Sequence, residues 1–95
     1  MKTPTPYKIE IFLTQLLYAG SEGISPSALA SIIQTQCIAK FAHVARSKGI
    51  SMQTKGRYKL IEAQSIDIAI DTVNEYKIQR GENTIPRELL IRGFE

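Results

Sequence analysis

The chain has 95 residues, 43% of them hydrophobic and 22% charged, which is an ordinary composition for one globular domain. No apolar run approaches the roughly 18 residues that span a bilayer, and the N-terminus lacks the apolar core of a signal peptide, so we expect a cytoplasmic protein without membrane contact. The single cysteine, Cys37, excludes an internal disulfide, and together with the single histidine, His43, it falls short of a four-ligand zinc site.

The sequence also lacks the patterns of common enzyme sites. It contains no glycine-rich phosphate loop, no cluster of metal-ligating residues and no Ser/His/Asp arrangement. We therefore expect a protein that is not an enzyme and that uses no cofactor, no metal ion and no small-molecule substrate.

Three helices are predicted in the first half of the chain. Residues 1–6 contain two prolines and are expected to be a flexible lead-in, and apolar residues at helical spacing predict a first helix over 7–19. Ser25 followed by Pro26 is typical of a helix N-terminus and predicts a second helix, which carries Leu29, Ile32 and Ile33. After a polar break, a third helix is predicted from Cys37, with these core residues: Ile38, Ala42 and Ala45.

Residues 50–61 alternate between apolar and polar, which predicts a β-hairpin. A three-residue loop, Thr54-Lys55-Gly56, gives glycine the left-handed position that such loops require. In this register Met52 lies opposite Tyr58, and Gln53 lies opposite Arg57. The apolar residues then share one face of the hairpin. Tyr58 is expected to be a core residue, and stacking on a base is the alternative.

The last third of the chain is predicted to be helical. Ser65 is expected to cap a fourth helix over 65–80, and a short last helix begins at Pro86. The fourth helix has an apolar stripe, which either packs on the first helix of the same chain or forms the interface of a homodimer. We expect the homodimer, held through six apolar residues: Ile66, Ile70, Val73, Leu89, Leu90 and Phe94.

Charge is distributed unevenly along the chain, whose net charge is +3. Residues 1–64 carry eight basic and three acidic side chains, a net of +5, whereas residues 65–95 carry four basic and six acidic ones, a net of −2. Six of the basic residues lie between Glu22 and Glu62, and no acidic residue occurs there. Such a block is either a solvated face or the surface that binds a polyanion such as DNA.

The order of three helices and a hairpin resembles the winged helix-turn-helix domain. The stretch Ala45-Arg46-Ser47-Lys48-Gly49-Ile50, followed by Tyr58-Lys59-Leu60, is similar to a helix-turn-helix family of bacteriophage and bacterial genomes. The resemblance covers about residues 7–62 and leaves 63–95 as a C-terminal helical extension. Phe41 replaces a polar residue of the family, so we expect it to pack on that extension or on a second protomer.

The resemblance implies a fold that is mainly α with a small β-hairpin: three helices plus a wing, followed by one or two C-terminal helices. It also implies that the third helix enters the major groove of double-stranded DNA and that the wing lies on the phosphate backbone. Helical spacing and the hairpin register then select the DNA-contacting residues. These are Thr35, Gln36, Lys40, His43, Arg46, Ser47, Lys55, Arg57 and Lys59.

Two functions from different classes remain. We expect a double-stranded DNA-binding protein, either a transcriptional regulator or an accessory factor of a phage or plasmid. The alternative is a winged-helix module that binds a host protein and does not bind DNA. Retention on heparin and its dependence on salt separate the two.

Overall fold

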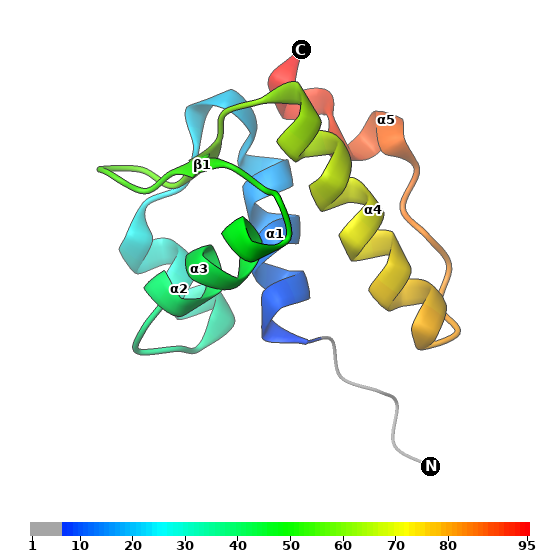
Figure 1. The fold of residues 1–95 in the computed structure, drawn as a ribbon, viewed down its shortest axis with the longest axis horizontal. Helices are drawn as coiled ribbons and strands as arrows, with labels where there is room; N and C mark the ends of the chain where they lie inside the picture. The colour runs from blue at the N-terminus through cyan, green and yellow to red at the C-terminus, as the bar shows by residue number, and fades with distance from the viewer. Residues whose placement is uncertain (1–6) are drawn as a thin grey trace.

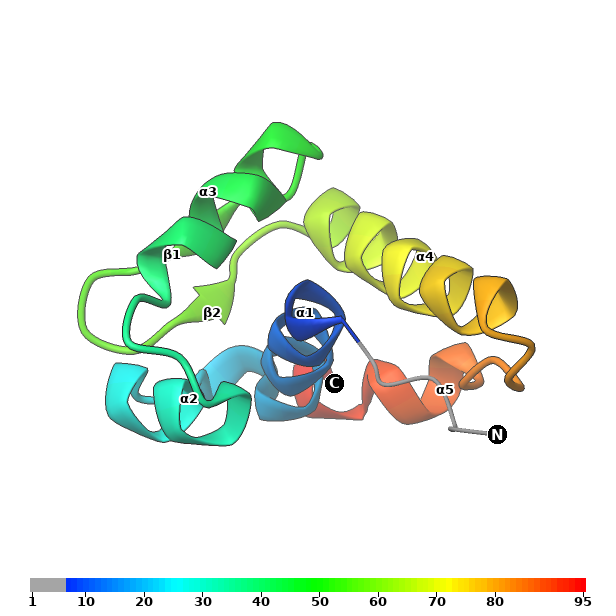
Figure 2. The ribbon, with the colours of Figure 1, turned by 90° about the horizontal axis from the view of Figure 1, so that it is seen from below.

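Helix α1 (Lys8–Ala19) lies at the centre of the fold, and the other helices pack around it (Figure 1). The computed structural model describes residues 7–95, so the lead-in expected at 1–6 lies outside the described residues. Four apolar side chains of α1 have no exposed surface: Phe12, Leu13, Leu16 and Leu17. In Figure 2, which looks nearly along α1, the other four α-helices surround it. The predicted first helix is therefore confirmed, and it is the element on which the core is built.

Helix α2 (Pro26–Ile33) begins at the predicted cap. The hydroxyl of Ser25 accepts a hydrogen bond from the backbone N–H of Ala28 at 3.3 Å, which satisfies one of the free donors at the helix start. The helix ends at Gln34, whose φ of 61° is in the left-handed region. Leu29 and Ile33 are buried, whereas Ile32 is exposed.

Helix α3 (Ala39–Ser47) buries Phe41, Ala42 and Ala45. The ring centroid of Phe41 lies 5.9 Å from that of Phe12, so Phe41 belongs to the core that α3 forms with α1. No second protomer is needed to bury this phenylalanine.

The hairpin pairs strand β1 (Met52–Gln53) with strand β2 (Lys59–Leu60) in antiparallel orientation. Met52 lies opposite Leu60, not opposite Tyr58, so the predicted register was wrong by two residues. The cause is a distant partner: the backbone of Tyr58 pairs with that of Ile24 through hydrogen bonds of 2.8 and 2.9 Å. A shift of two residues keeps every side chain on its predicted face, so Tyr58 is still buried.

Helix α4 (Ala63–Gln79) begins two residues earlier than predicted, and Ser65 is not its N-cap. Ser65 is buried, and its hydroxyl accepts a hydrogen bond from the backbone N–H of Ser51 at 2.7 Å. The side chain therefore ties the start of α4 to the segment that leads into β1.

The apolar stripe of α4 packs against α1 within the same chain. Ala69, Ile70 and Val73 are buried there, and helix α5 (Arg87–Leu90) adds the fully buried Leu90. These side chains belong to the same hydrophobic cluster as those of α1, α2 and α3. Side chains of residues 63–95 thus pack into the same core as those of residues 7–62.

The C-terminus is fixed by a close contact between two short 3-10 helices, η1 (Gly20–Glu22) and η2 (Arg92–Phe94). A Cβ atom on Gly93 would lie 2.7 Å from the Cα atom of Gly20, so the two backbones approach more closely than any side chain allows.

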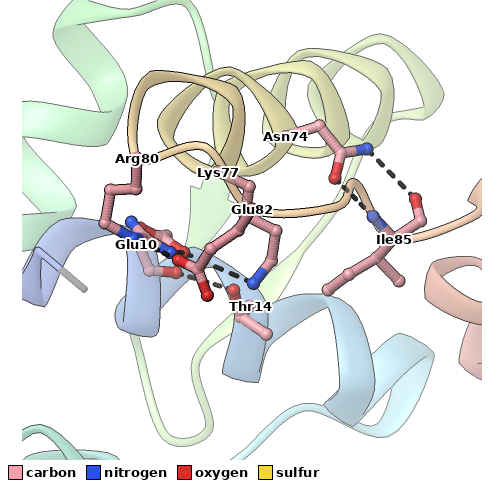
Figure 3. A network of polar contacts seen from close by, with 7 residues as sticks. All are labelled: Glu10, Thr14, Asn74, Lys77, Arg80, Glu82 and Ile85. Carbon is pink, nitrogen blue, oxygen red and sulfur yellow. Dashed lines mark hydrogen bonds and ion pairs between the residues drawn. The ribbon is translucent and has the colours of Figure 1, made fainter. Parts of the chain in front are cut away.

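A buried ion pair joins the start of α1 to the end of α4 (Figure 3). The carboxylate of Glu10 is only 3% exposed, and it accepts two hydrogen bonds from the guanidinium of Arg80, one of them at 2.9 Å. Arg80 also pairs with the more exposed Glu82. Hydrogen bonding to Glu10 holds the pKa of Arg80 above its ordinary value.

The segment after α4 is held by the side-chain amide of Asn74 (Figure 3). Its oxygen accepts a hydrogen bond from the Ile85 backbone N–H at 2.8 Å, and its nitrogen donates one to the Ile85 carbonyl at 3.1 Å. The segment between α4 and α5 has no regular secondary structure, and this pair of hydrogen bonds fixes its position.

Val73→Asp should unfold the chain. Val73 has no exposed surface, and a carboxylate without a partner is costly to bury, so we expect a loss of about 4 kcal/mol or more in the free energy of unfolding. Ile78→Asp is the matched control on the same helix because Ile78 is 65% exposed, and it should change stability by less than about 0.5 kcal/mol. Urea denaturation followed by circular dichroism measures both. A folded but monomeric Val73→Asp variant would instead place Val73 at a dimer interface.

Glu10→Gln should lower the denaturation midpoint clearly more than Glu82→Gln. Both substitutions keep the shape of the side chain and remove its charge, but only Glu10 is buried beside Arg80. Loss of the buried carboxylate leaves the guanidinium without its main counter-charge. Thermal unfolding of the two variants at the same pH measures the two midpoints. Equal decreases in the midpoint would show that the Glu10–Arg80 pair stabilises the fold no more than the Glu82–Arg80 pair does.

Candidate nucleic-acid interface

Seven polar or charged side chains of α3 and the hairpin form a surface that we call the basic face. It consists of Lys40, His43, Arg46, Ser47, Lys55, Arg57 and Lys59. All are exposed except Lys59, which is half-buried. In Figure 1 the hairpin lies beside α3, and its tip projects away from the rest of the fold. The structure thus places α3 and the hairpin, which carry these residues, beside each other, and Arg46 of α3 reaches the hairpin directly.

Packing against the core determines which side of α3 faces solvent. Phe41, Ala42 and Ala45 are buried, so the helical period directs Lys40, His43 and Ser47 to solvent. The hydroxyl of Ser47 donates a hydrogen bond to the Val44 carbonyl at 2.6 Å, so its proton is used within the helix.

Arg46 connects α3 to the hairpin. Its Nη2 atom lies 3.5 Å from the carbonyl oxygen of Met52 and 3.4 Å from Oγ1 of Thr54, and it donates to both. Sequence spacing predicted Arg46 as a DNA contact but did not indicate that its guanidinium binds the hairpin. The guanidinium fixes the hairpin relative to α3, while the residue as a whole remains exposed.

The tip of the hairpin is shaped by glycine and by one side chain. Gly56 has a φ of +78°, which favours glycine, and the Gln53 side-chain amide donates a hydrogen bond to the Lys55 carbonyl at 3.0 Å. Lys55 is therefore presented at the tip. Arg57 lies further back, because its Nη2 atom donates to the Gly23 carbonyl at 3.4 Å.

Thr35 and Gln36 lie in the connection between α2 and α3, before the first turn of α3. Thr35 is half-buried, and its hydroxyl accepts a hydrogen bond from the Cys37 backbone N–H at 3.3 Å, whereas Gln36 is exposed. Sequence reasoning missed Lys8, whose ammonium donates to the Gln34 carbonyl at 3.0 Å and adds a cation to this connection. No signal in the sequence joins residues 8 and 34.

The basic face ends where α3 meets α4. A small cavity of about 180 Å³ separates the end of α3 from the side of α4, and its lining includes Lys48 and Glu75. Beyond it, α4 exposes an acidic series at helical spacing: Asp67, Asp71 and Glu75. The sequence changes from a basic first part to an acidic last part, and the surface likewise changes from basic on α3 to acidic on α4.

Of the residues expected at a dimer interface, Ile70, Val73 and Leu90 are already buried within one chain. They belong to its own core and are not available to a second copy. Ile66 and Phe94 are half-buried, and Leu89 is exposed. Ile66 and Phe94 also line an apolar groove of about 250 Å³ between α4 and the C-terminus.

Other kinds of site find little support in residues 7–95. No three His, Cys, Asp or Glu side chains there are grouped so that they could hold a metal ion. Cys37 is exposed. None of the helices in that range is both long enough and apolar enough to cross a membrane.

Comparison of the chain with protein-family models, with curated proteins and with solved structures found no match.

Proposed function

We propose that the chain is a double-stranded DNA-binding protein of the winged helix-turn-helix class. In this proposal α3 enters the major groove, and the hairpin is the wing and lies on the phosphate backbone. The observation that carries the proposal is that the hairpin lies beside α3 (Figure 1) and that both elements carry exposed cations, which make up the basic face.

The charges of the basic face suit a polyanion. Its helix and hairpin come from the stretch between Glu22 and Glu62, which contains six basic residues and no acidic one. The exposed acids of α4 lie outside this face, so they do not oppose a phosphate backbone that follows α3 and the hairpin. Arg46 supports the arrangement because it holds the hairpin beside α3.

A helix suits the major groove for a geometric reason. The groove is about 12 Å wide, which admits one α-helix, and each base pair presents a distinct set of donors and acceptors there. The outward side chains Lys40 and His43 offer donors for such contacts. On this basis we propose a transcriptional regulator or an accessory factor of a phage or plasmid. The alternative, a winged-helix module that binds a host protein, does not need this concentration of cations.

Binding to a mixed-sequence duplex should weaken steeply with salt. If the five cations of the basic face contact about five phosphates, the slope of log K against log salt concentration is about −4 to −5. The double variant Lys55→Gln/Lys59→Gln changes only hairpin cations, so it should weaken binding to all duplexes alike and make the slope about 1.8 less steep. Fluorescence anisotropy over a salt series measures both quantities.

Arg92→Gln is the matched control because it removes an exposed cation from η2, far from the hairpin in the sequence. It should leave the slope unchanged. Salt-independent retention of the unmodified chain on heparin and on DNA would contradict the proposal and favour the protein-binding alternative.

A homodimer stays a prediction, now limited to the surface residues Ile66, Leu89 and Phe94. The groove beside Ile66 is also lined by Arg87 and Glu95, and Arg87 pairs with Asp67 of the same chain. Two copies on adjacent half-sites would multiply discrimination between DNA sequences. Sedimentation at high micromolar concentration should therefore detect a dimer that Phe94→Asp disrupts without unfolding the chain, and a monomer at that concentration would contradict it.

A further inference from the structure

The outward side of α3 carries one large apolar side chain, Val44, which is 38% exposed. It follows His43 directly, and its own carbonyl accepts the hydroxyl proton of Ser47. A β-branched residue has a lower helix propensity than the long polar residues that usually occupy exposed positions. Val44 does not belong to the buried core, and helix propensity does not favour a valine at this place.

The other outward side chains of α3 limit which base edges the helix can recognise. Between Ala39 and Ser47 there is no Asn, Gln, Asp or Glu, so the side chains that pair best with adenine or with the cytosine amino group are missing. Lys40 and His43 offer donors, which suit the O6 and N7 acceptors of guanine. Arg46 is engaged with the hairpin.

An apolar side chain has one specific partner in the major groove, the C5 methyl group of thymine. Val44 and His43 are separated by about 1.5 Å along the helix axis, and neighbouring base pairs by about 3.4 Å along the duplex. Because consecutive side chains also leave a helix about 100° apart, the two side chains diverge and are directed at adjoining base pairs.

We propose that Val44 is a specificity-determining residue that contacts a thymine methyl group, beside a guanine contacted by His43 or Lys40. The inference rests on the proposed function, because it places the outward side of α3 in the major groove. It goes further by naming the class of target: duplexes in which thymine and guanine occupy neighbouring positions of the site.

The test compares thymine with uracil, which differ only in that methyl group. Duplexes enriched by the full chain from a random 20-base-pair pool are resynthesised with uracil in place of every thymine, and both forms are titrated. The unmodified chain should bind the uracil form about fourfold more weakly for each methyl group it buries, the equivalent of about 0.8 kcal/mol. Val44→Ala should bring the ratio of the two affinities close to one.

Ile78→Ala is the matched control, because it truncates a second exposed β-branched residue on a different helix, α4. It should keep the fourfold ratio. A ratio of one for the unmodified chain, or an unchanged ratio for Val44→Ala, would overturn the inference while duplex binding itself stands. Enrichment of sequences without adjoining thymine and guanine would overturn it too. Absence of duplex binding at low salt would overturn the proposed function and this inference together.

Discussion

The burial of α1 is the constraint on which the rest of the structure depends. Four of its side chains have no exposed surface, and burial of each contributes about 1.5–3 kcal/mol. A helix of twelve residues cannot bury so many side chains alone, and it contacts α2 and α3 on one side and α4 and α5 on the other. The ion pair between Glu10 and Arg80 adds a polar connection at the end of α1 where the chain enters the fold. The C-terminal third is for this reason needed to complete the core.

The same constraint determines which surfaces are left for function. Because α3 turns Phe41 and two alanines toward α1, its opposite side must face solvent, and that side is basic. The inward side of α4 is likewise occupied, so its outer side is the acidic one. The outward side of α3 is therefore basic and the outer side of α4 is acidic, and a small cavity lies between the end of α3 and α4. This separation of charge is the physical basis for the proposal that DNA binds at the basic face.

Local sequence patterns were sufficient to predict the helices. They contained no information about which residues pair over long distances in the sequence. The period of α1, the Ser25 cap and the exposed side of α3 all depend on residues within a few positions of one another, and each prediction was confirmed. The hairpin register failed because Tyr58 pairs with Ile24, and alternation within the hairpin contains no information about that partner. In the candidate site, spacing identified which residues point outward. It did not reveal that Arg46 and Arg57 also hold the hairpin, because those contacts depend on tertiary structure.

The most direct test of the proposed DNA-binding face is a map of the residues that respond to DNA. A titration of the ¹⁵N-labelled chain with a mixed-sequence duplex at low salt, followed by amide chemical shifts, provides this map. The account predicts that the shifts concentrate in α3, at residues 39–47, and in the hairpin, at residues 52–60, and that the outer side of α4 changes little. Shifts concentrated in α4 and α5, or no shifts at an equimolar ratio, would contradict it.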